Sequence, residues 1–161
     1  MKTFKDFTKS NTKTLYVHRP VLNGEDIRNW FLKNGIDKTI DPSDMHITIA
    51  FSRTPINWNS CYFSKDKITL PENNNRYMKT LGEDGSAKVM CVKSDVLNSE
   101  WKYFKDRGAS WDWPEYEPHI TISYLSDINI YNIKPYLGII KLGPMKVNQV
   151  IENWKDNVKE K

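Results

Sequence analysis

The tetrapeptide His46-Ile47-Thr48-Ile49 recurs 73 residues later as His119-Ile120-Thr121-Ile122. In both copies histidine and threonine alternate with isoleucine, which is the pattern of a strand with one apolar face. A repeat of this kind indicates two structurally similar units within one chain. Other residue pairs related by the same shift are Val17 and Met90, Phe31 and Phe104, and Gly35 and Gly108.

Each tetrapeptide closes a predicted strand–helix–strand unit. The predicted elements are residues 15–19, 24–34 and 45–51 in the first unit, and residues 87–92, 97–107 and 118–125 in the second. Asn23 is the predicted N-cap of the first helix and Gly35 its left-handed stop. Weaker predicted strands are residues 61–63, 68–70, 76–81 and 146–154, while residues 133–140 are ambiguous. We therefore predict an α+β fold in which two pseudo-symmetric lobes of antiparallel sheet plus helices surround a central cleft.

The length of 161 residues suits one domain with a real core. We predict a polar N-terminal arm over residues 1–13 and a single bilobal domain over residues 14–161. No apolar run is long enough to span a membrane, and the charged N-terminus has no apolar stretch behind it. Cys61 and Cys91 form no CxxC pair. These features predict a soluble, cytoplasmic protein without a membrane partner.

The net charge is mildly basic, at +4, and the basic residues are scattered with no run of five. This distribution argues against a long duplex nucleic acid and favours a small anionic ligand. Aromatic residues make up 12% of the chain. Most of them are expected in the core, but such rings also suit a site that stacks nucleobases.

The spacing of the tetrapeptide places chemistry on one face of each strand. Residues i and i+2 of a strand share a face, so His46 lies beside Thr48, and His119 beside Thr121. Across a pseudo-twofold axis, one imidazole can accept a proton from an attacking hydroxyl while the other protonates the leaving oxygen. The threonine hydroxyls can donate to the non-bridging oxygens of a phosphodiester.

Metal and cysteine chemistry fit the sequence less well. His-x-Thr is not a usual ligand spacing, no HExxH sequence occurs, and the third histidine, His18, lies on a separate predicted strand. Neither cysteine neighbours a histidine. We therefore predict no catalytic metal and no cofactor.

Two His-x-Thr strands in a duplicated α+β chain resemble the two-histidine (2H) phosphoesterase superfamily. Within that superfamily, the stretches around residues 15–24 and 44–51 are similar to the phage anti-CBASS nucleases, which destroy the cyclic oligonucleotide signals of bacterial antiphage immunity. The resemblance covers the duplicated body, from about Leu15 through the last predicted strand.

The resemblance implies metal-independent cleavage of 3′–5′ linkages in cyclic di- or trinucleotides. The ribose 2′-hydroxyl would attack the adjacent phosphorus, with His46 and His119 as acid and base and with Thr48 and Thr121 holding the phosphate. Which histidine acts first is left open. Tyr16 is the leading candidate for substrate binding, because a tyrosine on the first strand serves this subfamily.

Further candidates for contact with the substrate lie near the end of the chain and in loops. Glu152 and Trp154 share one face of the last predicted strand, where a glutamate could read a base edge. The remaining candidates are Trp58, Trp111 and Trp113 for a lid, and Arg53 for the phosphate charge.

Two other functions remain open at this stage. The same fold could act on a linear RNA end, as a 2′,3′-cyclic phosphodiesterase or a 2′–5′ oligonucleotide phosphodiesterase. The protein could also be a sponge that binds cyclic nucleotides without cleaving them. Scattered basic charge disfavours a long RNA, and intact histidine and threonine at all four motif positions disfavour a sponge. The oligomeric state, a monomer included, is not determined by the sequence.

Overall fold

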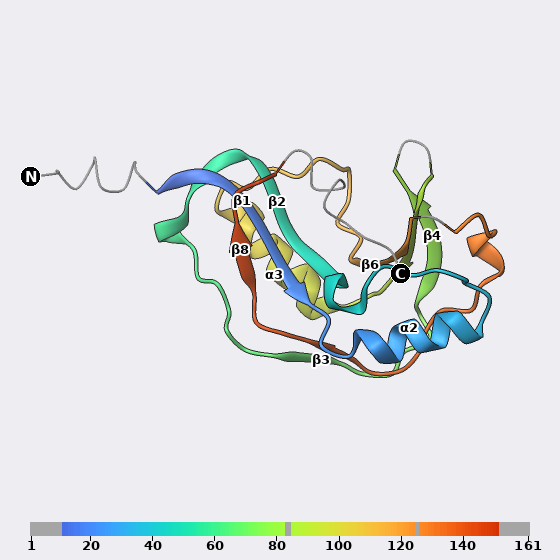
Figure 1. The fold of residues 1–161 in the computed structure, drawn as a ribbon. Coiled ribbons are helices and arrows are strands. Elements are labelled where there is room, and N and C mark those ends of the chain that lie inside the picture. Colours follow the sequence, from blue (N-terminus) through green and yellow to red (C-terminus); the bar gives the residue numbers. More distant parts are fainter. Residues whose placement is uncertain (1–10, 83–84, 125, 152–161) are drawn as a thin grey trace, which may run out of the picture.

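The computed structural model describes residues 11–82, 85–124 and 126–151, and it has the predicted α+β architecture (Figure 1). The helices of this described part are α2 (Gly24–Lys33) and α3 (Asp95–Asp106), with short 3-10 turns at Pro42–Asp44, Trp58–Ser60 and Ile130–Asn132. Its strands are β1 (Thr12–Pro20), β2 (His46–Asn57), β3 (Ile68–Leu70), β4 (Tyr77–Leu81), β5 (Ala87–Cys91), β6 (His119–Ser123), β7 (Ile140–Leu142) and β8 (Lys146–Asn148).

The strands form three antiparallel sheets. One has the order β2-β1-β8, a second has the order β4-β5-β6, and β3 pairs with β7 in a third. The first and second sheets each contain one tetrapeptide strand, β2 or β6, paired with the strand that opens its unit. The predicted duplication is therefore present as two sheets with matching spatial strand order, although the third strand β8 follows β2 in the chain whereas β4 precedes β5.

The register of the duplication differs from the simple shift of 73 residues. Ile47 pairs with Arg19, and its counterpart Ile120 pairs with Met90, so the structural counterpart of Met90 is Arg19 rather than Val17. The two helix starts, Gly24 and Asp95, are likewise 71 residues apart. The difference arises in the helices, because α2 has 10 residues and α3 has 12.

A glycine follows each helix, and Gly35 is the left-handed stop that the sequence predicts. Gly35 has φ 111° and Gly108 has φ 98°, a left-handed conformation that glycine adopts without strain. At Gly35 the space is also restricted, since a Cβ there would lie 2.9 Å from Cδ1 of Ile133.

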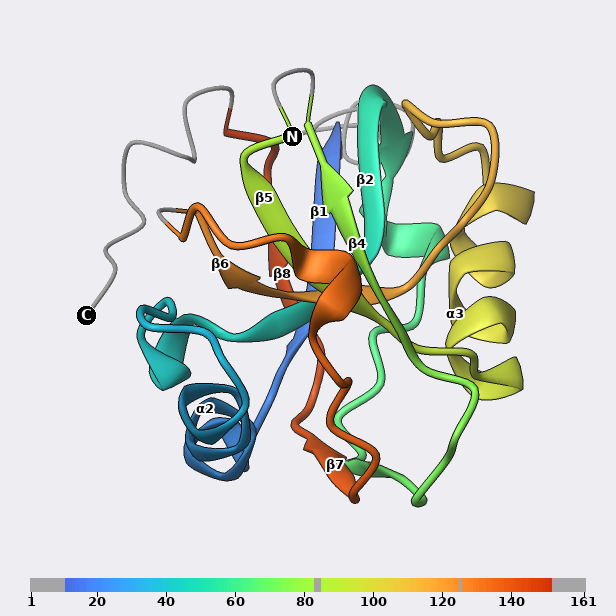
Figure 2. The ribbon, with the colours of Figure 1, turned by 90° about the vertical axis from the view of Figure 1, so that its right-hand side faces the viewer.

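Each helix lies beside the sheet of the other unit. Figure 1 shows α3 against the sheet of β1, β2 and β8, and α2 beneath β4 and β6; in Figure 2 the two helices flank the strands on opposite sides. The Trp30 indole of α2 donates to the carbonyl of Lys134, in the segment after β6, at 3.0 Å. The amide of Ile40 donates to the carbonyl of Ile122 in β6 at 2.8 Å. The units therefore share one core.

That core contains the isoleucines of both tetrapeptides. Ile47, Ile49, Ile120 and Ile122 are all fully buried and belong to one hydrophobic cluster. Burial of this kind is the main favourable term in folding, so the alternation of isoleucine with polar residues fixes which face of each strand points inward.

A buried ion pair ties the first sheet to α3. Arg19 of β1 is fully buried, and its guanidinium donates to both carboxylate oxygens of Glu100 at 2.8 and 2.7 Å. Its remaining nitrogen donates to the backbone carbonyls of Asp66 and Gly143. Four segments of chain thus meet at one side chain.

Several predicted boundaries were wrong. β1 begins at Thr12, inside the predicted arm of residues 1–13, and residues 1–10 lie outside the described residues. Residues 61–63 are not a strand, because the Tyr62 amide donates to the Tyr103 hydroxyl at 2.7 Å instead of to a neighbouring strand. β8 is shorter than predicted, ending at Asn148, and in the ambiguous segment only Ile140 joins a strand.

Asn23 precedes α2 as predicted but does not cap it through its side chain. Its amide group instead donates to the carbonyl of Ile139 and accepts from the amide of Lys141, which joins the start of α2 to β7. In the second unit Ser94 does cap α3, accepting from the amide of Leu97 at 3.2 Å. Within the described ranges, no helix has the length and apolar character needed to cross a membrane.

Replacing Arg19 with alanine is expected to lower the free energy of unfolding by about 3–5 kcal/mol, because Glu100 would keep a partly buried charge without its partner. The double variant Arg19→Met with Glu100→Leu should lose much less, since no charge is left behind. Urea denaturation at pH 7 measures both, with Lys141→Gln, at an exposed position of β7, as a control expected within about 0.5 kcal/mol of the parent. Equal losses in the single and double variants would contradict this account.

Candidate active site

The two tetrapeptide strands place histidine and threonine on the faces opposite their isoleucines. His46, Thr48, His119 and Thr121 are half-buried, whereas the intervening isoleucines are fully buried. The strands β2 and β6 contact one another, so the two His-Thr pairs come from adjoining edges of the two lobes.

The histidines are held by the same contact in both units. Nδ1 of His46 lies 2.8 Å from the carbonyl of Asp44, and Nδ1 of His119 lies 2.8 Å from the carbonyl of Glu117, in each case two residues earlier. A carbonyl only accepts, so Nδ1 carries the hydrogen, and Nε2 of the neutral ring is left as a proton acceptor. The duplication thus sets the same tautomer twice.

Tyr16 contacts the first histidine directly. Its hydroxyl lies 3.0 Å from Nε2 of His46, and given the tautomer above the phenol donates. Burial raises the pKa of Tyr16 to about 12, and a hydrogen bond to the Thr48 side chain partly offsets this effect. The phenol therefore stays protonated near neutral pH and occupies the nitrogen of His46 that would accept a proton.

A third histidine, for which the sequence pattern predicts no role, belongs to the same group. The ring of His18 stacks on that of Tyr16 with centroids 4.9 Å apart and meets the ring of His46 edge-on at 5.1 Å. His18 pairs with Thr48 across β1 and β2, which places it on the same sheet face as the candidate catalytic residues. The pairing of β1 with β2 identifies His18 as part of this group, and that pairing cannot be deduced from the sequence pattern alone.

A bulge in β2 brings one more aromatic ring to this face. Val17 pairs with Ala50 and His18 with Thr48, so Ile49 is the extra residue. Beyond this extra residue, the side chains that point to each face of β2 are reversed. Phe51 therefore pairs with Tyr16 and lies on the same face as Thr48, with the ring centroids of Phe51 and Tyr16 5.8 Å apart. The bulge therefore extends the aromatic part of the face beyond the motif.

The second motif also supports the first. The Tyr116 hydroxyl, three residues before His119, donates to the backbone carbonyl of Thr48 at 2.8 Å. The ring of Tyr116 stacks on Trp101 of α3 with an interplanar angle of 2°. Burial raises the pKa of Tyr116, so this donor also keeps its proton. A protonated phenol thus joins the two lobes at the site.

Burial disfavours the charged form of all three histidines. It lowers the pKa of His46 and of His119, while their hydrogen bonds to backbone carbonyls act in the opposite direction. His46 also lies close enough to His119 to lower its pKa further. Burial, with His46 and Lys146 nearby, lowers the pKa of His18 to about 4.

Charged groups beside His119 form a fixed cluster. Lys79 of β4 donates to a carboxylate oxygen of Glu117 at 2.7 Å, and the hydroxyl of Tyr77 donates to the other. These two contacts lower the pKa of Glu117, with Lys79 the larger cause. Since the carbonyl of Glu117 holds His119, the cluster anchors the backbone on which the second histidine depends.

The remaining predicted contacts have mixed outcomes. Arg53 forms an ion pair with Asp112 at 2.8 Å, so its charge is already matched. Trp113 is 55% exposed and lies 6.4 Å from the Phe51 ring, beside the site face. Trp111 packs in the cluster of Trp101 and Tyr116, and Trp58 packs on Phe63 and against the core. Glu152 and Trp154 lie outside the described residues.

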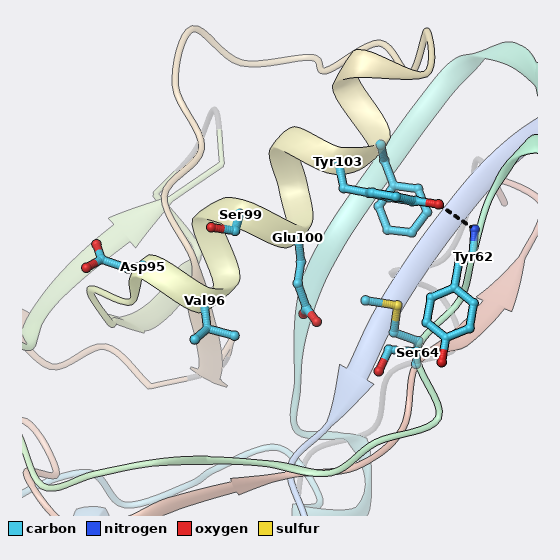
Figure 3. A pocket seen from close by; sticks show the side chains of 9 residues that line it. Tyr62, Ser64, Asp95, Val96, Ser99, Glu100 and Tyr103 are labelled. Atoms are coloured by element: carbon cyan, nitrogen blue, oxygen red, sulfur yellow. Dashed lines mark hydrogen bonds between the residues drawn. The ribbon is translucent and has the colours of Figure 1, made fainter.

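A pocket of about 470 Å³ lies between α3 and the segment containing Tyr62 and Ser64 (Figure 3). None of the four motif residues lines it. Glu100 does, but its carboxylate is held by Arg19, whose side chain leaves β1 on the face opposite His18. The pocket is therefore separate from the face that carries the histidines. Among the described residues, no three His, Cys, Asp or Glu side chains gather as a metal-binding group.

Comparison with protein families gives a match over nearly the whole chain. The family described as "Anti-CBASS protein Acb1" matches residues 13–157. Proteins of that name from Caulobacter sp. (strain RHG1) and Sphingomonas paeninsulae are 32% and 33% identical over 155 and 150 residues, which is 92% and 89% of this chain. The chain spans 24% of the length of each. The Acb1 of Salmonella phage S16 is 25% identical, covering 99% of this chain and 100% of the phage protein.

Solved structures share the fold. Escherichia coli LigT complexed with phosphate superposes with a TM-score of 0.58 at 10% identity, covering 94% of each chain. A structure described as a phosphoesterase gives a TM-score of 0.56 at 11% identity, covering 92% of this chain and 94% of that one. At this identity the likeness concerns the fold, and it confirms the predicted α+β, two-histidine-phosphoesterase-like fold.

Titration of the three histidines by NMR should separate them. His18 is expected to titrate near pH 4, and His46 and His119 below the ordinary value of 6.5. Since the folded pKa values are lowered, the unfolded chain binds more protons below pH 6.5. Above pH 6.5 the histidines are neutral in both states and do not lower the free energy of unfolding. As the pH falls from 6.5 toward 4, the unfolded chain takes up protons first and the free energy of unfolding decreases. A His18 midpoint at 6.5 or above would contradict its burial.

Proposed function

Because this chain belongs to the Acb1 family of anti-CBASS proteins, we propose that it is a metal-independent phosphodiesterase that cleaves 3′–5′ bonds of cyclic di- or trinucleotides. By destroying such immune signals it would let a phage evade bacterial CBASS defence. The observation that carries the proposal is the matched pair of histidines, each with Nδ1 on a backbone carbonyl, so that Nε2 is the nitrogen that can exchange a proton once Tyr16 is displaced from His46.

In the proposed reaction, one neutral imidazole accepts the proton of a ribose 2′-hydroxyl as its oxygen attacks the adjacent phosphorus. The bond from phosphorus to the 5′-oxygen breaks, and the other histidine, as imidazolium, protonates that oxygen. The products are a 2′,3′-cyclic phosphate and a free 5′-hydroxyl. If water then opens the cyclic phosphate, His46 and His119 exchange roles, and the first base is not assigned.

Thr48 and Thr121 are proposed to donate to the non-bridging oxygens of the phosphate. Each threonine lies two residues after its histidine on the same strand face, so a phosphate between the imidazoles is within reach of both hydroxyls. Donors fixed by a strand need little reorganisation when negative charge develops on the phosphate.

Tyr16 is proposed to contact the substrate, because its hydroxyl occupies the acceptor nitrogen of His46 in the free protein. A bound 2′-hydroxyl or leaving oxygen must take this place, after which the phenol is free to donate to the phosphate. Glu152 and Trp154 stay predicted base contacts. The proposed substrate also places the action of the protein inside the infected cell.

A panel of cyclic dinucleotides, cyclic trinucleotides and linear RNA ends, incubated with the protein in EDTA and analysed by mass spectrometry, tests the function. The expected result is cleavage of the cyclic substrates at a rate nearly unaffected by EDTA. Cleavage of linear ends alone would favour the RNA-end function, and tight binding of cyclic nucleotides without products would favour a sponge. Loss of activity in EDTA, restored by zinc or manganese, would contradict the mechanism.

Replacement of either histidine by alanine should lower turnover by roughly 10²–10⁴-fold, the usual effect of a positioned acid or base. The double variant should be little worse than either single variant, because the two act as a unit. Thr48→Ala and Thr121→Ala should cost less, since each removes one neutral donor. Single-turnover rates measure the effects, and circular dichroism confirms folding. Near-normal turnover in His119→Ala alone would separate the two lobes and refute a shared site.

A further inference from the structure

A row of polar residues crosses the first sheet from the motif to its far strand. Thr48 of β2 pairs with His18 of β1, and His18 pairs with Lys146 of β8. Residues paired in this way share a sheet face, with Cα atoms about 5 Å apart at each step. Lys146 therefore lies on the same face as Thr48, about 10 Å from it.

The middle of this row is an uncharged ring. His18 has its Nδ1 buried without a hydrogen-bond partner, and Tyr16 covers one side of the imidazole. Burial of Nδ1 leaves Nε2 as the nitrogen through which His18 can reach a ligand. Since the pKa of His18 is lowered to about 4, the positive charge of the row comes from Lys146 and not from the histidine.

The end of the row is an exposed cation. Among the residues described here, Lys146 has no carboxylate partner, whereas Lys79 is paired with Glu117 and Arg53 with Asp112 near the same site. The charge of Lys146 reaches His18, because it contributes to lowering the pKa of that ring. Asn148, exposed two residues later and paired with Tyr16, adds a second polar group on β8.

We propose that Lys146 binds a second phosphate of the substrate, one that is not being cleaved, and so selects cyclic oligonucleotides over ligands with a single phosphate. This inference rests on the proposed function. A cyclic di- or trinucleotide has one phosphate for each linkage, so at least one remains when another occupies the histidine pair. A 2′,3′-cyclic mononucleotide or a linear dinucleotide with one linkage has no group for Lys146.

The test compares Lys146→Gln with the parent protein on a cyclic dinucleotide and on a linear 3′–5′ dinucleotide that has one phosphate. For the cyclic substrate, KM should rise roughly tenfold at low salt, with kcat within about twofold, because a charge-assisted contact to a non-reacting group is lost. For the linear dinucleotide both constants should stay within about twofold. Lys146→Arg should retain most of the affinity, and Lys141→Gln, on β7 of another sheet, serves as the matched control.

Affinity for the cyclic dinucleotide is also measured by calorimetry at two salt concentrations, in the His119→Ala background. Lys146→Gln should weaken binding and reduce its dependence on salt, since one fewer phosphate charge is neutralised. Equal losses on the cyclic and linear substrates would overturn the inference in favour of a general effect of charge. If Lys146→Gln binds the cyclic dinucleotide as tightly as the parent does, the role of Lys146 is refuted and the proposed function still stands. A parent protein that neither binds nor cleaves any cyclic di- or trinucleotide of the panel would overturn the proposed function as well.

Discussion

The buried guanidinium of Arg19 is the constraint on which the face of the candidate active site depends. It comes from β1, the central strand of the first sheet, and it joins that strand to α3 and to the backbone carbonyls of Asp66 and Gly143. The neighbouring residue, His18, leaves β1 on the opposite face, and β1 also sets the position of β2 by pairing. The position of His46 therefore rests on an ion pair that lies on the far side of the sheet.

The duplication produces two equivalent histidines without making the lobes identical. In both units a backbone carbonyl two residues earlier orients the imidazole, and burial disfavours its charge. The surroundings then diverge, with Tyr16 and His18 beside His46, and Lys79, Tyr77 and Glu117 beside His119. The two imidazoles therefore lie in different electrostatic environments, which agrees with the proposed division into one base and one acid.

Much of the fold could be predicted from the tetrapeptide and its surroundings, since alternation with isoleucine identifies the strands and the two glycines end the helices. The register of β1 could not, because a gapless shift hides the two additional residues of α3. The loop at residues 61–63 was mistaken for a strand because its amide partner, Tyr103, is 41 residues away. His18 and Phe51 join the site only through strand pairing and the bulge at Ile49, which depend on tertiary packing.

The crossed placement of α2 and α3 links the folding of the two halves. A single strand–helix–strand unit would leave the apolar face of its helix without the surface that covers it in the whole chain, and its own sheet would lack the other helix. Such a half could complete its core only by exchanging helices with a second copy, as in a domain-swapped dimer.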